Sequence, residues 1–135
     1  MSEENVEAFK RGVEAANRRD IEALLAELDP EIEWHSALLA SVAGGAAVYR
    51  GHEGVRKWLR DLEEAFSEVH SEFSEIRDLG NRLVAIGRLR TRGKESGAET
   101  ESPVAWLVRF NDGKLIYARP YLDPNQGLEA AGLKE

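Results

Sequence analysis

The sequence contains no cysteine and no long apolar run among its 135 residues. Without cysteine, the chain cannot form the disulfides that stabilise many small extracellular proteins. The longest apolar stretch, residues 37–48, is interrupted by Ser41, Gly44 and Gly45, so it is unsuited to span a membrane. The first residues, 1–5, are acidic, whereas a secretory signal is basic and then apolar. We therefore expect a cytoplasmic protein with no membrane partner.

Positive charge is also scarce, since 18 basic residues face 25 acidic ones and the formal net charge is −7. This charge repels phosphate backbones and anionic lipids, so we expect no nucleic acid partner. The three histidines, His35, His52 and His70, are too far apart in sequence for a metal motif, and no glycine-rich phosphate loop is present. We expect no metal site and no cofactor.

The length fits one domain, residues 1–135. Apolar residues at helical spacing predict a helix from residue 2 to about 17, and Asp20 is placed to cap a short second helix that stops at Asp29–Pro30. A strand over 31–36 follows, with Ile32 and Trp34 on one face and Glu33 and His35 on the other. Residues 37–50 predict a long loop, of the kind that often forms a functional lid.

The second half of the chain is rich in strand patterns. A helix is predicted over 52–67, followed by strands over 69–78, 82–92, 99–110 and 114–122 and a capped helix over 123–133. The last two strands form a hairpin around Asn111-Asp112-Gly113. Its register should place Val108 opposite Ile116, and Trp106 opposite Ala118. This order predicts an α+β fold in which a curved antiparallel sheet wraps around the N-terminal helices as a cone.

Several segments carry a family resemblance. They are 17–20 (Asn-Arg-Arg-Asp), 29–35 (Asp-Pro-Glu-Ile-Glu-Trp-His), 49–55 (Tyr-Arg-Gly-His-Glu-Gly-Val), 111–115 (Asn-Asp-Gly-Lys-Leu) and the ending 121–133. Together with the element order, they resemble the SnoaL-like branch of the nuclear transport factor two superfamily over essentially the whole chain. The resemblance implies a conical pocket. It leaves the function open, because this superfamily includes ketosteroid isomerases, polyketide cyclases, epoxide hydrolases and noncatalytic binders.

The chain lacks residues that two of these activities require. The positions that align with the tyrosine and the two acids of ketosteroid isomerases hold Gly12, Trp106 and either His35 or Ser36. Gly12 and Trp106 cannot supply that acid chemistry. The pocket-facing aspartates that flank an arginine in the epoxide hydrolases are also missing from the predicted inner face. We expect neither activity.

The candidate catalytic residue is His35, because imidazole titrates near neutral pH and Glu33 could orient it as a general base. The alternatives are that His35 simply packs beside the loop, or that it points away and leaves Trp34 and Ser36 at the pocket wall. The candidate ligand-binding residues combine flat aromatic surfaces with apolar and hydroxyl-bearing neighbours. They are Trp34, Tyr49, Trp106, Val108, Ala118 and Ser102. For Trp58 and Phe110 we favour a role in the core, and Tyr49 is also suited to anchor the loop.

The outer sheet face combines a charge ladder with an apolar patch. The arginines lie on the outer face of the sheet if Arg92 pairs with Glu99 and Arg90 with Glu101. In that position they are more suited to form ion pairs with the neighbouring strand than to bind an anion. Leu107, Leu115 and Tyr117 share that face, which predicts a homodimer. We expect a protein that binds an apolar small molecule, with isomerase, cyclase or hydrolase activity on a cyclic carbonyl compound. The alternative is a noncatalytic ligand-binding or dimeric interaction module.

Overall fold

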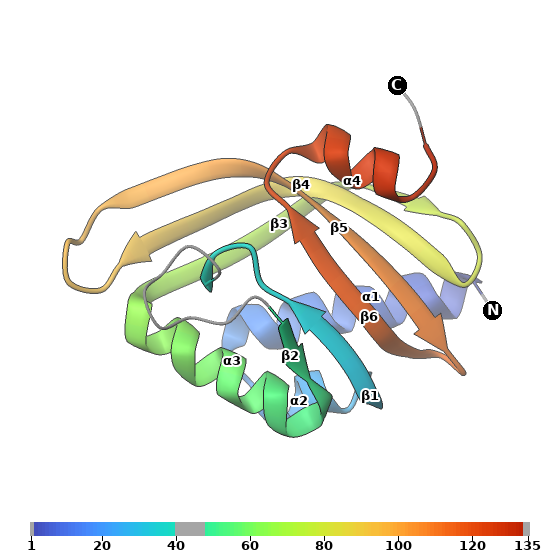
Figure 1. Cartoon of the computed structure of the whole chain (residues 1–135), viewed down its shortest axis with the longest axis horizontal. Helices are drawn as coiled ribbons and strands as arrows, with labels where there is room; N and C mark the ends of the chain where they lie inside the picture. The colour runs from blue at the N-terminus through green and yellow to red at the C-terminus, as the bar shows by residue number, and fades with distance from the viewer. Residues whose placement is uncertain (1, 40–47, 134–135) are drawn as a thin grey trace.

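The computed structural model describes residues 2–39 and 48–133. Its helices are α1 (Ser2–Arg18), α2 (Ile21–Leu25), α3 (Gly51–Ala65) and α4 (Pro124–Ala130). Its strands are β1 (Leu28–His35), β2 (Val48–Arg50), β3 (Phe66–Asp78), β4 (Arg82–Gly93), β5 (Glu99–Asn111) and β6 (Lys114–Tyr121). The strands form one sheet in the order β2-β1-β6-β5-β4-β3. Helices α1, α2 and α3 lie on its concave side and α4 on its convex side (Figure 1). The predicted α+β fold is confirmed.

Local sequence signals explain most element boundaries. The Asp20 side chain accepts a hydrogen bond from the backbone N–H of Ala23 and so caps α2. Asp123 caps α4 in the same way, and Gly132 ends that segment at a φ of 83°. The apolar faces of α1 and α3 pack with the concave sheet face into the main core. No helix among the described residues is long and apolar enough to cross a membrane.

Three boundaries differ from the sequence prediction. Helix α2 ends at Leu25 and β1 begins at Leu28, because buried Leu28 pairs with Leu115 instead of extending the helix. Phe66 begins β3 instead of ending α3. Residues 48–50, predicted as loop, form β2 against β1, because pairing with a neighbouring strand overrides a weak local pattern. The rest of that predicted lid, residues 40–47, lies outside the described residues.

The sheet is antiparallel except for β1 and β6, which run parallel. The predicted pairing of Arg92 with Glu99 and Arg90 with Glu101 is confirmed. The hairpin register is wrong by two residues, since Val108 pairs with Ala118. One residue comes from the turn, where Asn111 pairs with Lys114, and the other from Ile116, which is an extra residue in a bulge. A bulge shifts the side-chain alternation by one position. Leu115 therefore joins the inner core, and the prediction that it lies on the outer face is wrong.

A second bulge lies in β3 between Phe73 and Glu75, opposite Gly87. A Cβ atom at Gly87 would lie 1.8 Å from the carbonyl oxygen of Glu72, so the backbones can approach this closely only at a glycine. Bulges bend the strand that carries them. This bend contributes to the curvature of the sheet around α1 (Figure 1).

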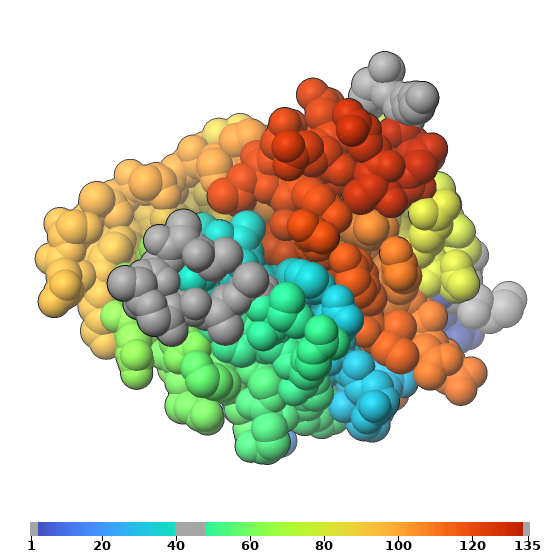
Figure 2. All heavy atoms as spheres, in the orientation of Figure 1, coloured from blue at the N-terminus to red at the C-terminus, as the bar shows by residue number. Residues whose placement is uncertain are grey.

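The convex face is partly covered by the chain's own C-terminal helix. Leu128 and Ala131 of this segment pack with Val84, Ala105 and Leu107 in a second core cluster, and the space-filling view shows α4 in direct contact with the strands beneath it (Figure 2). Leu107 is only 2% exposed, so it is not available to a partner. The two leucines on which the sequence-based dimer prediction rested are therefore buried within the chain.

Candidate functional site

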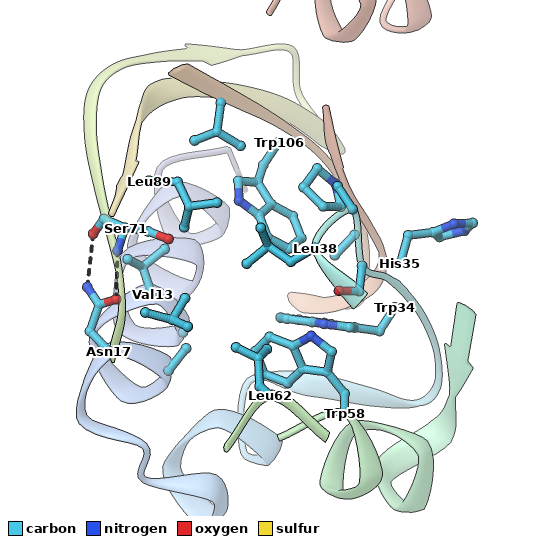
Figure 3. Close-up of a pocket in the computed structure, with 18 of the residues that line it drawn as sticks. Val13, Asn17, Trp34, His35, Leu38, Trp58, Leu62, Ser71, Leu89 and Trp106 are labelled. Carbon is cyan, nitrogen blue, oxygen red and sulfur yellow. Dashed lines mark hydrogen bonds between the residues drawn. The ribbon is translucent and has the colours of Figure 1, made fainter. Parts of the chain in front are cut away.

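An apolar cavity of about 90 Å³ lies between the helices and the concave sheet face (Figure 3). Helix α1 contributes Gly12 and Asn17, and α3 contributes Leu59 and Leu62. The strands, α2 and several residues between the regular elements complete the wall. The predicted ligand-binding residues Trp34, Trp106, Val108 and Ala118 all line it. Their inward direction follows from strand alternation, since each belongs to the core-facing set of its strand.

All three tryptophans of the chain meet in the cavity wall. The ring of Trp34 on β1 lies between the other two, with its centroid 4.9 Å from that of Trp58 and 5.5 Å from that of Trp106. The planes are tilted by 59° and 52°, which is near the edge-to-face arrangement that aromatic quadrupoles favour. Trp58, for which the sequence favoured a core role, therefore shapes the cavity as well.

Trp34 carries a hydrogen-bond donor that has no partner in the described part of the chain. Its Nε1 atom is buried and has no hydrogen-bond partner among the described residues. Leaving such a donor unpaired inside a protein costs about 1–3 kcal/mol. Because Trp34 belongs to the cavity wall, a hydrogen-bond acceptor on a bound molecule could remove this cost.

One end of the cavity is held by Asn17. Its side-chain amide donates to the carbonyl oxygen of Ser71 at 2.9 Å and accepts from the Ser71 N–H at 3.0 Å. Both residues line the cavity (Figure 3). The amide is therefore committed to the backbone of β3 and fixes the wall instead of serving a ligand.

His35 presents its ring to the other side of β1. The imidazole points away from the cavity (Figure 3), its Nε2–H donates to Glu33 at 2.6 Å, and its ring centroid lies 5.3 Å from that of Tyr117. This hydrogen bond is the main reason that the pKa of Glu33 lies below its ordinary value, and Arg50 adds to the effect. Of the two orientations left open by the sequence, the structure has the one with Trp34 and Ser36 at the wall. The idea that the His35 ring meets the cavity is wrong.

Two other predicted residues are absent from the cavity wall. The Tyr49 hydroxyl donates to Asp61 at 2.8 Å and its buried ring packs beside α3, whereas residues 40–47 of the loop that it was expected to anchor lie outside the described residues. Ser102 pairs with Leu89 on β4, one step further from the cavity along β5 than Val104. Leu89 and Val104 line the cavity, whereas Ser102 does not.

Two wall residues, Leu38 and Arg19, were not among the candidates named from the sequence. Leu38 follows β1 and lines the cavity near the indole of Trp106 (Figure 3). Arg19 follows α1 and has a positive φ of 59°. Both lie outside regular elements, so no periodic pattern marks their direction. Within the described residues, no group of three or more acidic or histidine side chains is placed to hold a metal ion.

Comparison with known proteins agrees with this architecture. Among curated proteins, none matches the sequence. An NTF2-like protein of unknown function from Burkholderia pseudomallei is similar in structure, with a TM-score of 0.80 and 23% identity over 93% of this chain and 95% of that one. TerC, crystallised with polyporic acid, has a TM-score of 0.79 and 22% identity over 93% and 96% of the two chains.

A third structure, a protein with a ketosteroid isomerase-like fold from Catenulispora acidiphila in complex with trimethylamine, has a TM-score of 0.75. It is 16% identical over 94% of this chain and 93% of that one. At these identities the three structures establish the shared fold. The sequence itself matches the family model described as SnoaL-like domain over residues 9–118. The chain therefore belongs to the SnoaL-like domain family.

Proposed function

We propose that this protein binds a small, flat, mainly apolar compound that carries a hydrogen-bond acceptor. The observation that carries this proposal is the Nε1–H of Trp34, which has no partner within residues 2–39 and 48–133 and belongs to a cavity wall made mainly of aromatic and aliphatic side chains. Flat rings can stack on the indoles, and a carbonyl oxygen can accept from Trp34. Two proteins of the same fold were crystallised with small organic molecules, polyporic acid in one and trimethylamine in the other.

The wall supports binding better than acid–base catalysis. Among the described residues that line the cavity, only Arg19 and His35 carry titratable side chains, and the His35 ring is turned away. A general base must come within hydrogen-bond reach of the proton that it removes. The described wall residues place no such group at the cavity, so we favour a noncatalytic binding module over an isomerase, cyclase or hydrolase acting on a cyclic carbonyl compound.

The size of the cavity limits the ligand. An apolar cavity of about 150 Å³ is known to take up benzene, and this one measures about 90 Å³. A single-ring compound therefore fits only with a small adjustment of the walls. Leu38 lines the cavity outside the regular elements, and a change of its rotamer is one such adjustment.

The test compares two molecules of nearly the same shape, acetophenone and α-methylstyrene, of which only the first has a carbonyl oxygen. The three indole N–H groups give three separate nuclear magnetic resonance signals, which Trp→Phe variants assign. Both compounds should shift these signals, acetophenone should bind more tightly, and it alone should move the Trp34 signal to lower field. Trp34→Phe should remove the preference, whereas Trp58→Phe should keep it. Failure of both compounds to shift any indole signal would refute the proposal.

A homodimer through the outer sheet face is a separate proposal. Helix α4 covers Val84, Ala105 and Leu107, so the contact would use the neighbouring half-buried side chains, Ile86 and Tyr121. Light scattering should give twice the monomer mass of 15.0 kDa. Ile86→Glu should then lower that mass to the monomer value, because it brings two carboxylates together in the contact. A monomer mass for the unmodified protein would refute the dimer.

A further inference from the structure

Arg19 places one positive charge in the wall of the apolar cavity. It lies beside Asn17 at the end of α1 and lines the cavity together with Leu59 and Leu62 of α3. No aspartate or glutamate is among the described residues that line this cavity. The described part of the wall therefore combines an apolar interior with a single arginine and no lysine.

The backbone at Arg19 is unusual for this residue type. Its φ of 59° lies in the left-handed region, and its N–H closes the end of α1 on the carbonyl oxygen of Ala16. Glycine is the common residue at such a helix end, because a side chain there is strained. The arginine at this position lacks that relief and is one of the residues that line the cavity. Strain of this kind is often found where a side chain serves a site.

The Arg19 guanidinium forms only one weak ion pair with the described residues. Its one ion-pair partner among the described residues is Glu63, with the closest nitrogen and oxygen atoms 3.6 Å apart. This distance is too long for a hydrogen bond. By contrast, Arg11 holds Glu27 with two hydrogen bonds of 2.9 and 3.1 Å. A guanidinium has five N–H donors in a fork that suits a carboxylate, so most of the binding capacity of Arg19 remains unused.

We propose that the natural ligand carries a carboxylate, which pairs with Arg19 while the apolar body occupies the cavity. This inference rests on the proposed binding function and adds the chemical class of the ligand. The Arg19 side chain is 26% exposed, so the carboxylate would sit at the edge of the cavity in contact with water. Its attraction should therefore weaken as salt increases. Glu63 competes with the ligand for the same cation.

The test uses benzoate and benzamide, which share size and shape but differ in charge. At pH 7 and low salt, benzoate should bind at least about five times more tightly than benzamide, as measured by the indole signals. In Arg19→Gln this preference should disappear while benzamide binding is retained, and in Glu63→Gln it should grow. Arg18→Gln is the matched control, because Arg18 is the neighbouring arginine and is not a wall residue. It should keep the preference.

The outcomes separate the two proposals. Benzamide binding without any advantage for benzoate would overturn the carboxylate inference and leave the binding function standing. An unchanged preference for benzoate in Arg19→Gln would also overturn it, because the anion would then be held elsewhere. If neither compound binds, both proposals fail. Melting curves and the dispersion of the indole signals verify that each variant is folded.

Discussion

The side-chain amide of Asn17 takes the place of a neighbouring strand beside Ser71. Strand β3 is at the edge of the sheet and pairs only with β4, so the outward N–H and C=O groups of Ser71 have no strand partner. Asn17 accepts from the first at 3.0 Å and donates to the second at 2.9 Å. The end of α1 is thereby tied to the sheet edge, and the cavity wall is closed at that point.

Asn17→Ala should therefore destabilise the protein by about 1–3 kcal/mol, because it leaves two partly buried backbone groups unpaired. Urea unfolding measures the loss, and hydrogen exchange should show a faster rate at the Ser71 amide. Asn111→Ala is the control, since Asn111 bonds Asp29 at an exposed site. That change should cost less than about 0.5 kcal/mol. Equal losses in the two variants would contradict the role of Asn17.

Gly12 leaves open space in the cavity at the expense of helix stability. It lies within α1 and lines the cavity, and a Cβ atom there would meet nothing closer than Leu24 Cδ1 at 3.8 Å. Gly12→Ala should stabilise the helix by about 0.5–1 kcal/mol and weaken binding of acetophenone, because the methyl group fills part of the cavity. Thermal unfolding and ligand titration measure the two effects.

Gly54→Ala provides the comparison within α3. A Cβ atom at Gly54 would lie 3.0 Å from the backbone carbonyl carbon of Tyr49, so the same substitution should stabilise less or destabilise, without affecting the ligand. Stronger acetophenone binding in Gly12→Ala would show that the ligand does not occupy the space beside this residue.

Much of the fold could be read from the sequence because local and long-range signals agree. The register of β4 and β5 follows from alternating arginines that face alternating glutamates, as in the pair Arg92 and Glu99 at 2.6 Å. The next hairpin has no such ladder. There a bulge at Ile116 absorbs one residue, and no feature of the sequence distinguishes this position from its neighbours.

The candidate site was harder to predict for two reasons. Strand alternation alone placed His35 with Glu33, away from Trp34, and that is its position in the structure. Its chemical suitability as a base was not evidence of its direction. Arg19 could not be found at all, because a left-handed residue after a helix directs its side chain independently of the helical period.

Trp106→Ala should enlarge the cavity and cost about 3 kcal/mol, which is the lower end for a tryptophan because the ring is only half-buried. Indole added to the variant should restore part of this loss by filling the vacated space. Phe110→Ala is the matched control, because Phe110 is buried in the core but is not a wall residue. It should be destabilised without rescue. An equal effect of indole on both variants would contradict the placement of Trp106.

Asp61 makes stability depend on pH. The Lys57 ammonium and the Tyr49 hydroxyl each donate a hydrogen bond of 2.8 Å to its carboxylate. Both bonds lower the pKa of Asp61, and the bond from Lys57 has the larger effect. A carboxylate with a lowered pKa in the folded state stabilises the protein above its ordinary pKa and loses this contribution as the pH falls through the folded-state value.

Asp61→Asn should therefore cost about 1–2 kcal/mol at pH 7, and the difference should shrink as the pH falls below about 4. Urea unfolding across this range measures it. Asp112→Asn, which removes the same charge in the exposed β5–β6 turn, is the control and should change the free energy of unfolding little at pH 7. A loss in Asp61→Asn that is as large at pH 3 as at pH 7 would mean that packing, and not ionisation, explains the contribution of Asp61.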